Sequence, residues 1–332
     1  MARASAFVAQ ERLAQAAFLQ DTEPERAGLG GAPYRLRPED YGLNLAPSIR
    51  DEADAYFAQH GITRHTHLAH GLSSQACCLN FLMPLARRPD VLAQLVGRAL
   101  AIQPPEMLRV EDGPGGDWFI GFEWIGAGNP LGEWPSTGKA TRGANVTSTD
   151  AVVMFEHDGQ PETLLIEWKY TEAYGAPLMN NVRADGKLSG NAKRTARYAD
   201  KAFVPNGPIT PEPQLALDAF FWEPFYQLLR QQMLAWRLEH APRGYRTRVL
   251  HISPRANTAL HTVTSPVFQK RSHSDAFKAF ESVLAAEADG VPRFRSVYVE
   301  DLFGPLLQAA VDDPWATYLL RRYRFLTESS ET

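Results

Sequence analysis

The stretch that decides the fold reads TSTDAVVMF at residues 147–155 and, after a short polar segment, TLLIEWKYTE at residues 163–172. Both arms are rich in β-branched and aromatic residues, which favour strands. The segment between them contains the turn-forming pair Asp158-Gly159, typical of a tight hairpin. The sequence therefore predicts a β-hairpin. With its turn centred on Asp158-Gly159, Asp150 lies directly opposite Glu167.

Charged side chains gather at the open end of this hairpin. Side chains alternate between the two faces of a strand, so Glu167 and Lys169 share one face, about 6.6 Å apart, while Trp168 points to the other. Two carboxylates and an ammonium group are therefore expected to converge. The structural alternative is an exposed strand with a cross-strand Lys–Glu pair that stabilises by only about a few tenths of a kcal/mol.

Asp150, followed after sixteen residues by Glu167-x-Lys169, resembles the active-site signature of the PD-(D/E)xK nuclease superfamily. Thr149 replaces the proline of that name, which has no chemical role. The resemblance implies a nuclease that hydrolyses phosphodiester bonds, above all of DNA, with Asp150 and Glu167 binding Mg²⁺ or Mn²⁺. Hard divalent cations prefer oxygen ligands and lower the pKa of an attacking water. Lys169 would orient that water or stabilise the pentavalent phosphorane.

Composition sets wider bounds. The chain has 332 residues, 44% of them hydrophobic, enough for one domain of about 200 residues with appendages or for two domains. Its net charge of −4 does not indicate nucleic-acid binding, although a local basic stripe would suffice. The only cysteines, Cys77 and Cys78, are adjacent, which excludes a disulfide framework and fits a cytoplasmic protein. No apolar run approaches the ~18 residues of a membrane span.

A strong helix is expected to begin at Ser73 or Ser74, with a kink or break at Pro84. Its opening SSQA, residues 73–76, and the following Asn80-Phe81 resemble the first core helix of restriction-endonuclease-like members of the superfamily. In many of these members that helix carries a polar residue facing the metal site. The resemblance makes Gln75 the candidate. The alternative is that Gln75 only forms hydrogen bonds at the helix N-terminus.

Residues 117–125 form the next expected strand, because Trp118, Ile120, Phe122 and Trp124 alternate with other residues. In this pattern Glu123 points to the face opposite the tryptophans. Placed before the hairpin, the segment would be the first strand of the catalytic sheet. Glu123 would then be a third acid near the metal, or alternatively a solvent-facing side chain.

Two segments are candidates for contacts with the phosphate backbone. Arg142 and Asn145 lead into the Asp150 strand and can either contact phosphate or fix the loop. The polar, basic segment 181–201 follows the Lys169 strand and is predicted to track the backbone, the alternative being a solvated loop and helix face. Its candidate residues are Arg183, Lys187, Lys193, Arg194 and Arg197.

A long helical stretch, residues 215–240, carries Gln227 and Gln231 four residues apart and therefore on one face. In several superfamily members a glutamine on this helix approaches the site. With a final strand at 246–252, the order is helix, three strands, helix, strand. This order resembles the αβββαβ restriction-endonuclease-like core, an α/β fold with a mixed central sheet flanked by helices. We expect a helical extension at 1–61, the core at 62–256, and a mostly helical extension packed on it at 257–332.

Other interpretations remain at this stage. His65, His67 and His70 resemble a metal-ligand cluster of a metallohydrolase. Residues 132–141 resemble a phosphate-binding loop but depart from its spacing. The nuclease fold can also serve as a catalytically silent nucleic-acid-binding scaffold, or the enzyme can cleave RNA. Double-strand cutting would favour a symmetric homodimer.

Overall fold

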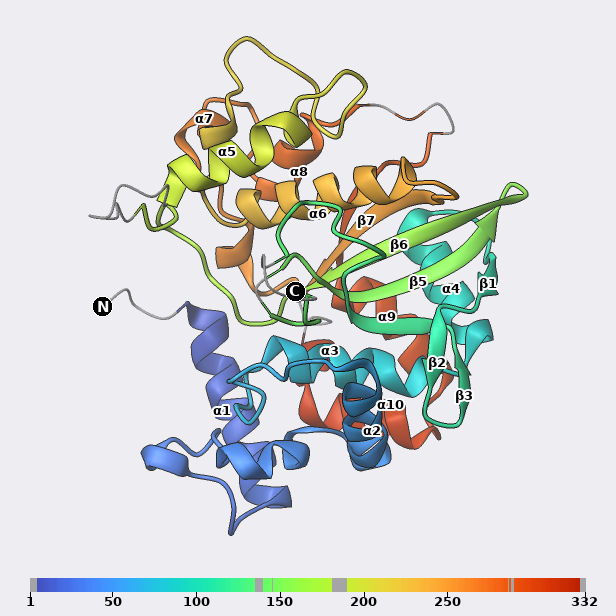
Figure 1. Cartoon of the computed structure of the whole chain (residues 1–332). Coiled ribbons are helices and arrows are strands. Elements are labelled where there is room, and N and C mark those ends of the chain that lie inside the picture. Colours follow the sequence, from blue (N-terminus) through green and yellow to red (C-terminus); the bar gives the residue numbers. More distant parts are fainter. Residues whose placement is uncertain are drawn as a thin grey trace.

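A mixed six-stranded sheet runs through the molecule, with helices on both faces (Figure 1). The computed structural model describes residues 5–134, 140–144, 146–180, 190–285, 287 and 290–328. Strand β5 lies inside the sheet, antiparallel to β6 on one side and to β1 and β4 on the other; β7 and β8 continue beyond β6 in parallel. The strands of this sheet are β1 (Glu106–Leu108), β4 (Ile120–Trp124), β5 (Thr149–His157), β6 (Gln160–Trp168), β7 (Arg246–Ser253) and β8 (Phe294–Tyr298). A separate hairpin pairs β2 (Glu111–Gly113) with β3 (Gly116–Trp118).

The β5–β6 hairpin confirms the predicted turn and register. Asp158 and Gly159 adopt φ values of 51° and 71°, the left-handed conformation that a two-residue type I′ turn requires at both central positions. At the other end of the ladder Ala151 pairs with Ile166. Asp150 and Glu167 are therefore the next residues toward the open end of the hairpin.

Helices cover both faces because the inner strands are apolar on both faces. Val153 and Ile166 pack into one hydrophobic cluster, and Val152 and Leu165 pack into the other, as expected for strands buried on both sides. The first cluster lies against α1 (Ala6–Thr22), α2 (Arg50–His60), α3 (Ser74–Leu82), α4 (Pro89–Leu100), α9 (Val299–Ala309), α10 (Pro314–Arg322) and α11 (Phe325–Glu328). The second lies against α5 (Gly190–Ala202), α6 (Phe225–Glu239), α7 (Pro266–Gln269) and α8 (Ala276–Glu281). The predicted α/β fold with a mixed, helix-flanked sheet is confirmed.

The helix expected from Ser73 begins and breaks where predicted. The Ser73 hydroxyl accepts a hydrogen bond from the Ala76 amide at 3.2 Å and caps α3. Pro84 lies in a short 3₁₀ turn at Met83–Leu85, and the chain continues as α4. Proline has no amide hydrogen to donate, which explains the break.

The first and last parts of the chain lie side by side beneath the sheet, where α1 packs against α10 (Figure 1). The buried Arg322 guanidinium joins them, donating to Gln15 Oε1 at 3.0 Å and to the Asn44 carbonyl at 2.6 Å. The C-terminal segment also contributes β8, so the sheet itself continues past residue 256.

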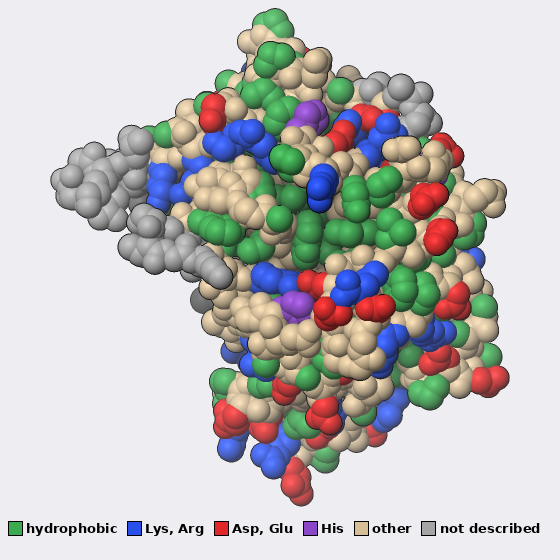
Figure 2. All heavy atoms as spheres, turned by 45° about the vertical axis from the view of Figure 1, so that its right-hand side comes forward, with side chains coloured by type: hydrophobic (Ala, Val, Ile, Leu, Met, Phe, Trp, Pro, Cys, Tyr) green, Lys and Arg blue, Asp and Glu red, His purple; other side chains and the backbone are tan. Residues whose placement is uncertain are grey.

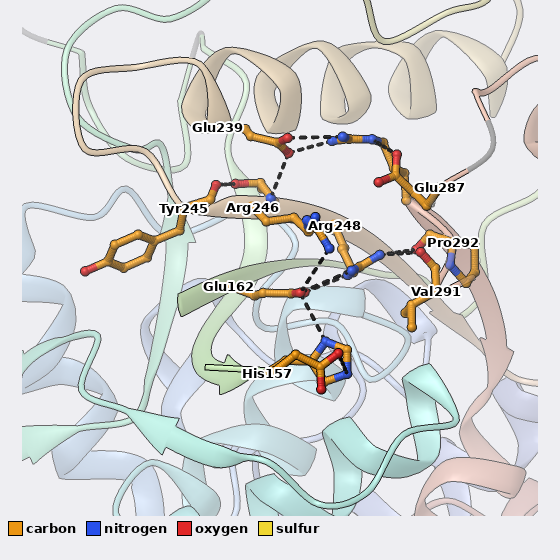
Figure 3. A network of polar contacts seen from close by, with 12 residues as sticks. His157, Glu162, Glu239, Tyr245, Arg246, Arg248, Glu287, Val291 and Pro292 are labelled. Atoms are coloured by element: carbon orange, nitrogen blue, oxygen red, sulfur yellow. Dashed lines mark hydrogen bonds and ion pairs between the residues drawn. The ribbon is translucent and has the colours of Figure 1, made fainter. Parts of the chain in front are cut away.

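A buried ion pair connects β6 and β7 near the start of both strands (Figure 3). Arg248 donates to both carboxylate oxygens of Glu162, at 2.6 and 3.1 Å, and both side chains are almost fully buried. His157 lies 3.2 Å from the same carboxylate. Removing one member of such a pair leaves a buried charge without a partner and strongly destabilises the fold. The folded protein therefore depends on both residues at the contact between β6 and β7.

Candidate active site

Asp150, Glu167 and Lys169 meet at the open end of the hairpin, as predicted. The Lys169 ammonium forms a hydrogen-bonded ion pair with Glu167 and lies 4.0 Å from Asp150 Oδ2. The same Asp150 oxygen accepts the Trp168 amide hydrogen at 2.7 Å. The three side chains line a pocket of about 200 Å³, while Trp168 packs into the core on the α3 side.

The two carboxylates are unusually hard to ionise. Burial, with the negative field of Glu123 in addition, raises the pKa of Asp150 to about 7. Burial and the nearby Asp150 charge raise the pKa of Glu167 to about 7. Burial alone would lower the pKa of Lys169, but the two carboxylates raise it above its ordinary value. Lys169 is therefore charged, and one ammonium does not fully compensate two carboxylates.

Glu123 and Gln75 join this site. The Gln75 amide donates to Glu123 Oε1 at 2.6 Å, and its oxygen accepts the His65 amide hydrogen at 3.0 Å. Ser148 donates to the other Glu123 oxygen at 3.2 Å. Burial raises the pKa of Glu123. Both side chains are buried. Glu123 lines the pocket of the acid pair, so the solvent-facing alternative does not describe it, whereas Gln75 lines the adjoining larger cavity and joins the site through its hydrogen bond to Glu123.

The backbone at Glu123 differs from the expected regular strand. Its φ is 48°, a left-handed value that is uncommon for a residue other than glycine. The alternation of faces breaks there: Trp118 and Phe122 pack into the cluster on the α3 side, whereas Trp124 packs against the cluster on the α6 side. The prediction that Trp124 shares a face with Trp118 is wrong, because a period-two pattern assumes extended backbone throughout.

Helix α6 supplies a further contact to the acid pair. The Gln231 amide donates to Glu167 Oε2 at 2.7 Å and to the Ser148 carbonyl at 2.8 Å. Gln227, one turn earlier, also lines the pocket. The expectation that this glutamine face approaches the site is confirmed.

Arg142 holds the loop before β5. Its side chain is only 12% exposed. It donates to both Glu111 oxygens at 3.0 Å and to the Glu123 carbonyl at 3.2 Å. Since its donors are occupied inside the protein, the structure favours loop fixing over the predicted phosphate contact.

The described part of the predicted phosphate-tracking segment lies on α5. Lys193 is exposed there, Arg197 is half-buried, and Arg194 donates to the Met179 carbonyl at 3.1 Å and to Asn191 Oδ1 at 2.7 Å. None of these three basic residues lines the pocket of the acid pair. Asn145, Arg183 and Lys187 lie outside the described residues, and their role stays a prediction.

The sequence did not point to a second, larger cavity of about 800 Å³ that shares His65, Asp150 and Lys169 with the first. Arginines from three segments that are distant in the sequence line this cavity. A local sequence pattern cannot predict that such residues lie close together. His65 Nε2 lies 3.4 Å from Glu123 Oε1. Within the described ranges, no group of three or more His, Cys, Asp or Glu side chains has metal-binding geometry, so the three-histidine metal cluster finds no support. In the same ranges no helix has the length and apolar character of a membrane span.

A mixed sheet between two helical layers, with two acids and a lysine at the end of its central hairpin, defines a restriction-endonuclease-like protein. The chain belongs to the family described as Restriction Endonuclease associating with ARP, whose model matches residues 6–324. The match includes both terminal segments, and membership indicates a nuclease-like role. Comparisons with curated proteins and with solved structures gave no match.

Proposed function

We propose that this protein is a metal-dependent nuclease that hydrolyses phosphodiester bonds of DNA. The observation that carries the proposal is the convergence of Asp150, Glu167 and Lys169 in one pocket. The buried Glu167 and the partly buried Asp150 share one ammonium, which disfavours full ionisation of both, and a divalent cation would relieve that cost.

The donor set fits magnesium or manganese. Asp150 is 23% exposed, and in the part of the chain that the structure describes its Oδ1 has no hydrogen-bond partner. Mg²⁺ is commonly bound through one or two carboxylates and keeps several waters, so the two carboxylates of Asp150 and Glu167 are sufficient. Asp150 and Glu167 would hold the ion, which when bound would lower the pKa of the attacking water and neutralise charge on the phosphate.

The protein's own residues complete the site. Lys169, beside Glu167, is placed to orient the attacking water or to stabilise negative charge on the phosphorane. Gln231 fixes the orientation of the Glu167 carboxylate through its 2.7 Å hydrogen bond. Gln75 fixes the orientation of the Glu123 carboxylate through a hydrogen bond of 2.6 Å. A third carboxylate is thereby held beside Asp150 and Glu167.

Cleavage assays test the proposal. Supercoiled plasmid, linear double-stranded DNA, single-stranded DNA and RNA are incubated with Mg²⁺, Mn²⁺ or a chelator, using wild type, Lys169→Ala and the exposed-lysine control Lys270→Ala. We expect metal-dependent DNA cutting by wild type and Lys270→Ala and none by Lys169→Ala. Cleavage of RNA alone would replace the DNA assignment. If neither wild type nor either variant cleaves a substrate, and wild type does not bind Mn²⁺, the protein is instead a catalytically silent nucleic-acid-binding scaffold.

A further inference from the structure

On the face that Figure 2 draws, no surface for a polyanion is obvious. Figure 2 shows acidic and basic side chains mixed around a band of hydrophobic side chains. The overall charge of −4 points the same way. A nucleic-acid strand at the acid pair therefore needs a local basic path, and the 800 Å³ cavity beside the pair is the place to look.

Three arginines line that cavity, each from a different part of the N-terminal region: Arg12 from α1, Arg35 from the loop after it, and Arg64 from the segment after α2. All three are exposed. Arg64 pairs with Asp54 at 2.8 Å. Across the residues that the structure describes, Arg12 and Arg35 have no carboxylate partner, so their charges are left for a ligand.

One histidine of the cavity, His70, lies near two of these arginines. Burial, and then the charges of Arg35, His67 and Arg12, lower the pKa of His70 to about 4. The acid Glu172 also lines the cavity, but the Tyr170 amide donates to it at 2.8 Å. Away from Asp150 and Lys169, the charged lining of the cavity is therefore three arginines and one carboxylate, that of Glu172.

We infer that this cavity holds the phosphates of one nucleic-acid strand next to the scissile bond, with Arg12 and Arg35 as the main contacts and Arg64 as a third. The inference rests on the proposed nuclease function. The cavity opens onto Asp150 and Lys169, so a strand lying in it reaches the acid pair directly. Its volume is in the range of about 300–1,000 Å³ that encloses small ligands, which suits a few nucleotides of a single strand. The N-terminal segment is thus part of the substrate-binding surface.

Equilibrium binding without cleavage tests this. A fluorescent single-stranded DNA oligonucleotide is titrated in chelator at increasing salt with wild type, Arg12→Gln/Arg35→Gln, and a control with two exposed basic residues removed elsewhere, Arg98→Gln/Lys270→Gln. Each lost phosphate contact reduces the slope of log affinity against log salt by about 0.7 for a single strand. We expect the cavity variant to lose a slope of roughly 1.4 and the control to keep the wild-type slope.

An unchanged slope in the cavity variant, or an equal loss in the control, would overturn the inference. Binding of a mononucleotide as tight as that of the oligonucleotide would also overturn it, in favour of a small phosphorylated ligand. The two proposals fail separately. If DNA binding depends on Arg12 and Arg35 but no DNA is cleaved, only the proposed nuclease activity is contradicted. If DNA is cleaved but its binding does not depend on these arginines, only the assignment of the cavity is contradicted.

Discussion

Gln231 on α6 donates one amide group both to Glu167 on β6, at 2.7 Å, and to the carbonyl of Ser148, at 2.8 Å. This side chain therefore joins the helix, the acidic strand and the loop that enters β5. Both oxygens of Glu167 are engaged, one by Lys169 and one by Gln231. A buried hydrogen bond to a metal-binding carboxylate typically changes metal affinity or activity about 10–100-fold when removed.

Gln231→Leu should accordingly lower the cleavage rate by about 10–100-fold. The neighbouring Gln232 is an internal control because it is also buried, but its amide has no hydrogen-bond partner within the described ranges. Gln232→Leu should leave activity unchanged and stability equal or higher, since no hydrogen bond is lost. Steady-state cleavage and thermal unfolding of both variants check this. Equal activity loss in the two would assign the effect to helix packing.

Ionisation of Asp150 should destabilise the metal-free protein. Its pKa is about 7 when folded and about 3.9 in an unfolded chain, so the folded state binds the proton more tightly. Stability therefore falls as pH rises through this window. Asp150→Asn keeps an acceptor for the Trp168 amide and removes the charge, and should stabilise the metal-free protein by about 1–3 kcal/mol near pH 8 and by less near pH 5.

Denaturant unfolding of wild type and Asp150→Asn at the two pH values measures this difference. Asp312→Asn, at an exposed aspartate, should change stability little at either pH. The same stability difference for Asp150→Asn at both pH values would show that Asp150 titrates normally.

The Glu162–Arg248 pair should be among the most sensitive points of the sheet. Arg248→Met leaves the Glu162 carboxylate buried without its main partner and should cost about 3–5 kcal/mol in unfolding free energy. Replacing both residues with apolar ones should restore part of that loss. Arg109→Met breaks the exposed pair with Asp117 at 2.6 Å and should cost at most about 1 kcal/mol. Similar losses for the buried and the exposed arginine would contradict this assignment.

The part of the site that could be predicted from the sequence depends on local regularity. Asp158-Gly159 fixes the turn, strand alternation then fixes the faces, and together they place Asp150, Glu167 and Lys169. Helical spacing places Gln227 and Gln231 on one face, and the resemblance to the nuclease superfamily implied that this face approaches the site. These residues were predictable because each lies on an element whose period is visible over several residues.

What could not be predicted depends on irregular backbone or on segments distant in the chain. The left-handed φ of Glu123 has no signature in the sequence. Whether Arg142 faces a phosphate or Glu111 depends on a contact across 31 residues. The arginine-lined cavity is assembled from α1, its following loop and the segment after α2. Residue type and spacing do not indicate which distant segments of the chain come into contact.

Titration with Mn²⁺ near pH 8, followed by the electron paramagnetic resonance of the free ion, tests the Asp150–Glu167 pair as a metal site most directly. At that pH both carboxylates are mostly ionised. Wild type and the exposed-site control Asp312→Asn should bind the ion equally, and Asp150→Asn should bind it at least roughly 100-fold more weakly. Equal Mn²⁺ binding by wild type and Asp150→Asn would contradict a metal site at this pair.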